Sequence, residues 1–150
     1  MSLYDQISAD LISAIKSRNQ GEIRALQSIK AQLQLLRTEK GNSVEITAED
    51  ELKVLMRMAK QRRDSIEIFA RENRNDLALI EQEELVVIDR YLPAQLSEEE
   101  LEREIRTIIQ NSGATGMAQM GMVMGMASKA LNGKADGKRI SEWVKKILQG

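Results

Sequence analysis

Residues 91–101 read YLPAQLSEEEL, and this stretch decides how the chain is divided. Pro93 is the only proline in the chain, and a proline disfavours helical geometry at the residue before it. Ser97 followed by Glu100 is typical of a helix N-terminus, because the hydroxyl and the carboxylate satisfy free backbone groups there. The stretch ends one helix and begins another, and it predicts a boundary between residues 1–92 and residues 93–150.

Both sides of this boundary have the residues that helices favour. The chain of 150 residues is 42% hydrophobic and 3% aromatic, and Leu, Ile, Ala, Glu, Lys and Arg are abundant. Apolar residues recur at helical spacing, and capping residues mark the helix ends. These signals predict helices over about residues 3–18, 22–40, 48–71, 77–91, 98–110, 120–130 and 141–148. We expect an all-α protein with a larger N-terminal unit of about four helices and a small C-terminal three-helix unit.

The composition excludes much of catalytic chemistry. The sequence contains no Cys and no His, so it offers no thiolate nucleophile, no imidazole base and no usual set of zinc ligands. Its apolar runs are too short to span a membrane, and its first residues lack the pattern of a secretory signal. We therefore expect a cytoplasmic protein with no catalytic residue, no metal, no cofactor and no membrane contact.

Charge is unevenly distributed although the net charge is only −1. Residues 53–74 hold seven basic and three acidic residues, and residues 75–104 hold two basic and ten acidic residues. Residues 107–150 are basic again, with six basic and two acidic residues. A polyanion would prefer this last segment, and the scarcity of aromatic rings favours contacts to the phosphate backbone over base stacking.

The basic segment supplies the candidate binding residues. They are Lys129, Lys134, Lys138, Arg139, Lys145 and Lys146. Residues 132–137 read NGKADG and are predicted to form a loop, in which Gly133 and Gly137 set the shape. Backbone amides of such a loop can approach a phosphate oxygen, so amides and cations would converge on one ligand.

Residues 117–126 carry five methionines and two glycines. Gly121 and Gly125 are four residues apart, a spacing that allows two helices to pack closely or a foreign backbone to approach. Methionines more often fill a core than form a binding groove, and the spacing of Trp143 on the last helix also favours packing.

Several of these stretches together resemble the GatB/YqeY family. They are MGMVMG at residues 120–125, NGKADGKRIS at 132–141, QRRDSIE at 61–67 and the segment from Glu83 to Leu101. The resemblance implies an α-helical module that occurs free-standing, at the C-terminus of the B subunit of glutamyl- and aspartyl-tRNA amidotransferase, and on some glutaminyl-tRNA synthetases. It implies tRNA as a partner, with amidotransferase subunits or an aminoacyl-tRNA synthetase as further partners, and no DNA.

The leading hypothesis is a tRNA-associated accessory module that binds by backbone and shape without catalysis. One alternative is an enzyme of carbon–nitrogen ligation with glutamine as amide donor. Another is a protein-interaction module that uses the methionine-rich helix or the acidic stretch around Glu81, Glu83 and Glu84. Should the C-terminal cations not bind RNA, the third helix offers Arg57, Lys60, Arg62, Arg63 and Arg71.

Overall fold

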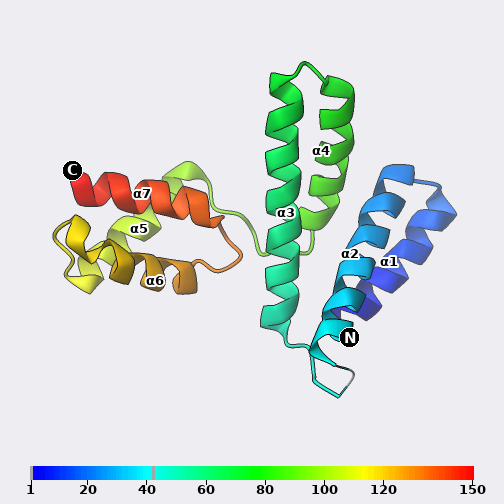
Figure 1. Cartoon of the computed structure of the whole chain (residues 1–150), viewed down its shortest axis with the longest axis horizontal. Coiled ribbons are helices and arrows are strands. Elements are labelled where there is room, and N and C mark those ends of the chain that lie inside the picture. The colour runs from blue at the N-terminus through cyan, green and yellow to red at the C-terminus, as the bar shows by residue number, and fades with distance from the viewer. Residues whose placement is uncertain (1, 42) are drawn as a thin grey trace. The chain divides into compact units, whose positions relative to one another are not determined.

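The computed structural model describes residues 2–41 and 43–150, and throughout these residues the regular structure is helical (Figure 1). The all-α prediction is confirmed. The helices are α1 (Leu3–Ser17), α2 (Gln20–Lys40), α3 (Ala48–Arg71), α4 (Asn75–Asp89), α5 (Glu98–Ser112), the short 3₁₀ helix η1 (Met117–Gln119), α6 (Met120–Ala130) and α7 (Gly137–Gln149). Among the described residues, no helix is both long and apolar enough to cross a membrane.

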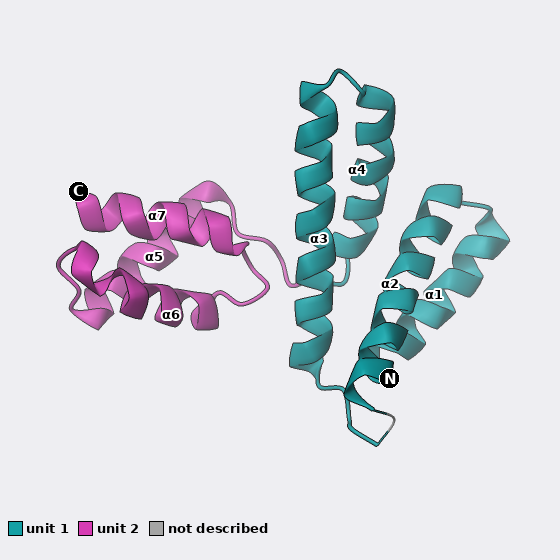
Figure 2. Cartoon of the chain, in the orientation of Figure 1, with its two compact units in different colours: residues 1–92 teal, residues 93–150 magenta. Residues whose placement is uncertain are grey.

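Contacts divide the chain into two compact units (Figure 2). The N-terminal unit is residues 1–92 and contains α1 to α4. The C-terminal unit is residues 93–150 and contains α5, η1, α6 and α7. The division falls between Leu92, which lies in the core of the first unit, and the single proline at position 93.

Most of the helices are capped at their N-terminus by a side chain. Ser2, Asn19, Thr47, Ser97 and Asp136 each accept a hydrogen bond from a backbone amide in the first turn of the helix that follows. The cap of α3 is a full capping box, because the Asp50 carboxylate also accepts a hydrogen bond from the backbone amide of Thr47. These caps place helix starts where the sequence predicts them for α1, α3 and α5.

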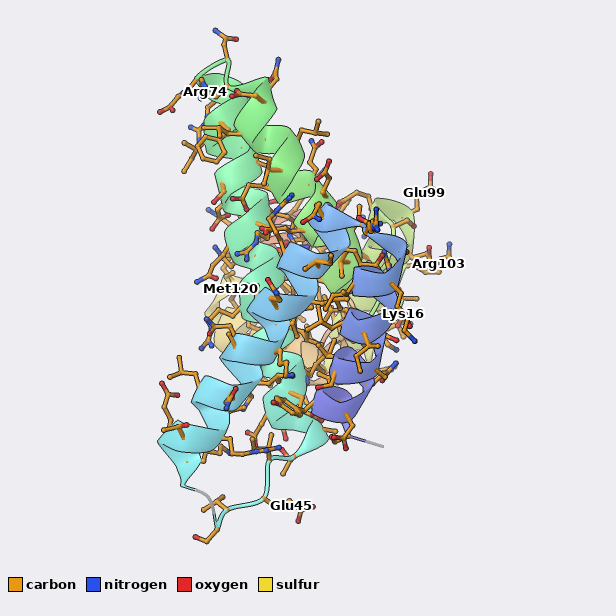
Figure 3. The ribbon with its side chains drawn as sticks, turned by 90° about the vertical axis from the view of Figure 1, so that its right-hand side faces the viewer. Lys16, Glu45, Arg74, Glu99, Arg103 and Met120 are labelled. Carbon is orange, nitrogen blue, oxygen red and sulfur yellow. The ribbon has the colours of Figure 1, made fainter. Side chains whose placement is uncertain are left out.

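The N-terminal unit consists of two antiparallel helix pairs, α1–α2 and α3–α4, with α2 packed against α3 and α4 (Figure 1). Figure 3 shows Arg74 at the tip of the α3–α4 hairpin and Glu45 in the connection at the opposite end of this unit. All four helices contribute to its core. The core residues are Ile7, Ala14, Ala25, Leu26, Ile29, Leu33, Val54, Leu55, Met58, Ala59, Val87, Ile88 and Leu92.

Hydrogen bonds join the residues at the end of α4 to α1 and α2. The Tyr91 hydroxyl donates a hydrogen bond to the Asp10 carboxylate on α1, and burial together with this carboxylate raises the pKa of Tyr91. Arg90 donates to Glu22 at 2.9 Å. These bonds fix the chain just before Pro93.

The C-terminal unit packs α5, α6 and α7 around a second core. Its fully or nearly buried residues are Leu101, Ile105, Ile109, Val123, Ala127, Leu131, Ala135, Ile140, Val144 and Leu148. Met120, Met124 and Trp143 pack against this core. Met117, Met122 and Met126 are exposed, so core packing is wrong for three of the five methionines. Two of these three, Met122 and Met126, lie on the same side of α6.

The last helix begins earlier than predicted. It starts at Gly137 rather than near Ser141, because the Asp136 carboxylate accepts from the amide of Arg139 at 2.9 Å and caps it. The Asp-Gly pair, which is typical of a turn, here forms a cap and a first helical residue. Lys138 and Arg139 therefore lie in the first turn of a helix and not beside a loop.

Candidate nucleic-acid interface

Helix α7 has one apolar side and one basic side. Ile140, Val144 and Leu148 are buried, and at 100° per residue one exposed lysine lies opposite them while two others lie toward the flank of the buried side. These are Lys138, Lys145 and Lys146, which we call the α7 lysine face. Lys138 and Lys145 are seven residues apart and so project in nearly the same direction, with Glu142 between them.

Two further lysines that the sequence suggests as binding residues precede this helix in the chain, and both are exposed. Lys134 lies in the loop before α7, and Lys129 lies in the last turn of α6. Gly133 lies in the same loop, and its φ of 81° is in the left-handed region that favours glycine. Five of the six predicted cations are thus exposed to solvent.

Arg139 has a different position from the one expected for a phosphate contact. Its Nε donates to Glu98 Oε1 at 2.7 Å, and its Nη2 donates to the backbone oxygen of Leu96 at 3.0 Å. The charge of the guanidinium is therefore balanced by a carboxylate on α5. Arg139 joins α7 to the start of α5, which makes it a positioning residue rather than a free cation.

Glu98 also receives a second bond from α7. The Trp143 indole donates to Glu98 Oε2 at 2.7 Å, so both carboxylate oxygens are bonded. The Trp143 and Arg139 donors lower the pKa of Glu98 from its usual 4.5. We call Glu98, Arg139 and Trp143 the Glu98 clamp. The sequence indicated only that Glu98 begins a helix, and partners more than 40 residues away leave no signal in a single sequence.

Most of the loop before α7 is bonded within the chain. The amide of Leu96 donates to the oxygen of Lys134 at 2.9 Å, and the Gln95 side chain donates to the oxygen of Gly133 at 2.6 Å. The amide of Lys134 donates to Leu131, and the amide of Arg139 donates to Asp136. The amides of Lys134 and Arg139 are therefore engaged within the chain, and anion binding by the amides of Gly133 and Gly137 stays a prediction.

The glycines of α6 do not serve helix packing within the chain. A Cβ atom built on Gly121 or on Gly125 would meet no atom within 4 Å, and both residues are exposed. Close packing of a neighbouring helix on this side of α6 is therefore wrong for the described structure. Approach of an external backbone to the two glycines stays a prediction.

The acidic stretch of the N-terminal unit holds helices together. Glu84 accepts from Arg62 Nε at 2.9 Å, and Glu81 lies 3.4 Å from the same nitrogen. Arg62 also donates to the Ser28 hydroxyl at 3.2 Å, and Arg24 on α2 pairs with Glu83 at 3.1 Å. This network joins α2, α3 and α4, so the acidic residues are engaged inside the unit.

The alternative cations of α3 are mostly paired as well. Besides Arg62, Lys60 pairs with Asp64 at 2.8 Å, and Arg71 lies 3.9 Å from Glu67. Arg63 is close enough to Asp89 to oppose the rise in the pKa of that carboxyl that burial causes. Among the residues that the structure describes, no group of three acidic side chains is arranged to hold a metal ion.

The geometry defines a class: a small all-helical protein whose C-terminal three-helix unit carries an exposed lysine face and no metal-binding group among its described residues. The particular family follows from comparison with known proteins. The chain belongs to the family of YqeY-like proteins, whose model matches residues 4–148. The resemblance in its motifs therefore extends over nearly the whole chain.

Relatives of two kinds are similar to this chain. The E subunit of glutamyl-tRNA(Gln) amidotransferase from Thermococcus gammatolerans is 47% identical over 58 residues, which cover 36% of this chain and 9% of the relative. Altered inheritance of mitochondria protein 41, mitochondrial, of Clavispora lusitaniae is 33% identical over 109 residues, covering 69% of this chain and 61% of the relative. The same-named protein of Meyerozyma guilliermondii is 29% identical over 131 residues, covering 83% of this chain and 66% of the relative. The chain thus spans less than two thirds of each of these relatives.

Proposed function

We propose that this chain is a tRNA-associated accessory protein that binds the tRNA backbone through lysines of its C-terminal unit and performs no catalysis of its own. The α7 lysine face is the observation that carries the proposal. Its three lysine residues are exposed on one helix and lie outside its buried side, with the Lys146 ammonium over the Trp143 ring at 4.9 Å. A surface of this kind suits a ligand whose charge is regularly spaced along a chain.

The relatives indicate which polyanion to test. The amidotransferase component that matches a segment of this chain carries glutamyl-tRNA(Gln) in its name. Double-helical RNA exposes phosphates and 2′-hydroxyls more readily than base edges, so lysines suffice to bind it by shape and charge. Amidotransferase subunits or an aminoacyl-tRNA synthetase are the proteins with which such a module would act. The cytoplasmic location stays a prediction, since two relatives have a mitochondrial name.

A salt titration of binding to total tRNA tests the proposal. Neutralising about four phosphates gives a slope of log affinity against log salt of roughly −3 to −4. The double variant Lys138→Ala/Lys145→Ala should bind more weakly, and its slope should be shallower by roughly 0.7 to 0.9 for each lysine removed. A slope near zero for the unchanged protein would contradict the proposal.

A matched control separates the lysine face from total charge. The variant Lys16→Ala/Lys53→Ala removes two exposed lysines from α1 and α3 and changes the net charge by the same amount. We expect its tRNA affinity and its salt slope to equal those of the unchanged protein. Equal losses in both double variants would show that total charge, and not the α7 lysine face, sets the affinity.

Independent catalysis is tested directly. The chain has neither Cys nor His, and amide transfer from glutamine needs an activated nucleophile. We expect no product when the purified chain is given glutamine, ATP and misacylated tRNA. Product formed by the chain alone would establish an enzyme, and product formed only with amidotransferase subunits would support an accessory role.

A second candidate function is protein docking on α6. Met122 and Met126 are 47% and 40% exposed, and flexible thioether side chains suit an adaptable protein contact. A partner captured from extract that resists nuclease and is lost in Met122→Lys would favour this function.

A further inference from the structure

A cavity of about 280 Å³ lies in the N-terminal unit, at the end where α2 is connected to α3. Its lining comes from the start of α1, from α2, from this connection and from α3, and includes Tyr4, Leu33, Arg37, Glu45, Ile46 and Glu51. Figure 3 shows Glu45 in the connection. The volume is that of roughly nine water molecules at about 30 Å³ each, so it fits a ligand of about that many non-hydrogen atoms.

Arg37 lines this cavity without a carboxylate partner. Its guanidinium lies over the Tyr4 ring, with Cζ 5.1 Å from the ring centroid. With the residues that the structure describes it forms no ion pair, whereas Arg24, Arg62 and Arg90 of the same unit each bind a carboxylate. A guanidinium that stacks on a ring keeps N–H groups at its edge, where they can donate to a carboxylate. Arg37 is thus equipped to bind an anionic group in the cavity.

Glu51 lines the same cavity and lacks a cationic partner. Its carboxylate accepts a hydrogen bond from the backbone amide of Leu3, and no described cation pairs with it. Burial raises the pKa of Glu51, and the nearby charge of Asp50 adds to this rise, while the Leu3 amide opposes it. The carboxylate has therefore lost water without gaining a positive charge nearby, which favours a ligand that brings one.

The rest of the lining narrows the class of ligand. Leu33 is buried and Ile46 is partly buried, so the cavity has an apolar wall. Glu45 adds a second carboxylate at an exposed position. Two carboxylates against one guanidinium repel a phosphate or another simple anion. A small ligand that has both charges and an apolar part matches all three features of the cavity.

We propose that this cavity binds a free α-amino acid with an apolar side chain. Arg37 binds the ligand carboxylate, Glu51 binds the ligand ammonium group, and Leu33 and Ile46 contact the ligand side chain. Such a ligand satisfies two opposite charges that line one cavity and do not pair with each other. The site is separate from the α7 lysine face, and it does not depend on RNA binding.

An NMR titration of the full chain with L-leucine tests the proposal. A small, open site predicts a dissociation constant on the order of 1 mM, with shifts of the backbone amides around the cavity. Two analogues each lack one charge: 4-methylpentanoate has no ammonium group, and 3-methylbutylamine has no carboxylate. Each should bind at least about tenfold more weakly than leucine, because one charged hydrogen bond is lost. An analogue that binds as tightly as leucine would overturn the proposal.

Two substitutions test the residues. Arg37→Met and Glu51→Gln should each weaken leucine binding at least about tenfold, and the glutamine keeps an oxygen for the Leu3 amide. Arg57→Met and Glu39→Gln are the controls, because they change the same groups at exposed positions outside the cavity and should leave the affinity unchanged. Circular dichroism checks that all four variants stay helical. No leucine-induced shift around the cavity, or unchanged affinity in either cavity variant, would overturn the proposal.

Discussion

The two units use their charged residues in different ways. In the N-terminal unit, arginines on one helix bind carboxylates on another, as in the pairs Arg62–Glu84 and Arg24–Glu83. In the C-terminal unit, Arg139 forms such a pair with Glu98, while the three lysine residues of the α7 lysine face are exposed. Both units contain basic segments in sequence. The comparison shows that a count of cations does not locate a binding surface, because the structure decides which cations are already paired.

We expect the largest difference in stability between a paired and an exposed cation at Arg62. Its side chain is 18% exposed, and Arg62→Met leaves the Glu81 and Glu84 carboxylates without their shared donor. Glu84 keeps only the more distant Arg24 Nε at 3.9 Å. Because largely buried carboxylates that lose a hydrogen-bond donor are costly, we expect a loss of about 1–3 kcal/mol in the free energy of unfolding of the N-terminal unit. Thermal unfolding followed by circular dichroism measures it.

The control for this change is Lys145→Met on the exposed side of α7. A surface lysine without such a network should change the free energy of unfolding by less than about 0.5 kcal/mol. Equal free energies of unfolding for the Arg62 and Lys145 variants would contradict the view that paired cations stabilise the fold and exposed ones do not.

A smaller effect is expected for Glu98→Gln, which removes the charge of the Glu98 clamp. Trp143 is the only tryptophan of the chain, so tryptophan fluorescence reports the surroundings of this one indole, which include Glu98, the Lys146 ammonium and the core. The pKa of Glu98 is lowered below 4.5 in the folded protein, so its stabilising contribution is fully present above pH 4.5. The contribution is lost as pH falls through that lowered pKa.

An acid titration of Trp143 emission measures this effect. The unchanged protein should show a transition below pH 4.5 that precedes global unfolding by circular dichroism. The Glu98→Gln variant should lack that transition. A transition of the same midpoint in both proteins would assign it to another carboxylate and would remove Glu98 from the clamp.

The smallest effect is expected at Lys138, and it has opposite signs for stability and binding. Lys138 lies in the first turn of α7, where the helix dipole disfavours a positive charge. Lys138→Glu should therefore stabilise the C-terminal unit by about 0.3–1 kcal/mol while weakening tRNA binding. Trp143 emission during thermal unfolding gives the first quantity, and the salt titration gives the second.

Lys145→Glu is the matched control, because Lys145 lies beyond the first turn of the same helix. It should weaken tRNA binding to a similar extent without raising stability. Unchanged tRNA binding in both charge reversals would contradict a role of the α7 lysine face.

Local signals made most of the helical architecture predictable. The side chains of Thr47 and Ser97 accept hydrogen bonds from amides three residues later and so mark helix starts. Such short-range bonds can be predicted from the sequence. Asp136 and Gly137 show the limit of this approach. Asp-Gly fits both a turn and a capped helix start, and the packing of Ile140 and Val144 into the core decides for the helix.

The candidate site was predictable only in part. The exposed positions of Lys138 and Lys145 follow from the amphipathic pattern of α7, which is a local property. The engagement of Arg139 depends on Glu98, and that of Arg62 depends on Glu84, which lies on the following helix. Pairings of this kind depend on how helices pack, and one sequence without its fold does not contain that information.

The bond between Tyr91 and Asp10 affects the order in which the chain folds during synthesis. It connects residues 81 positions apart, so it can form only after residue 91 has left the ribosome. At that moment the three later helices are still inside the exit tunnel or not yet made. The N-terminal unit can thus close first, whereas the other unit must wait for α7, the helix that brings both donors to Glu98.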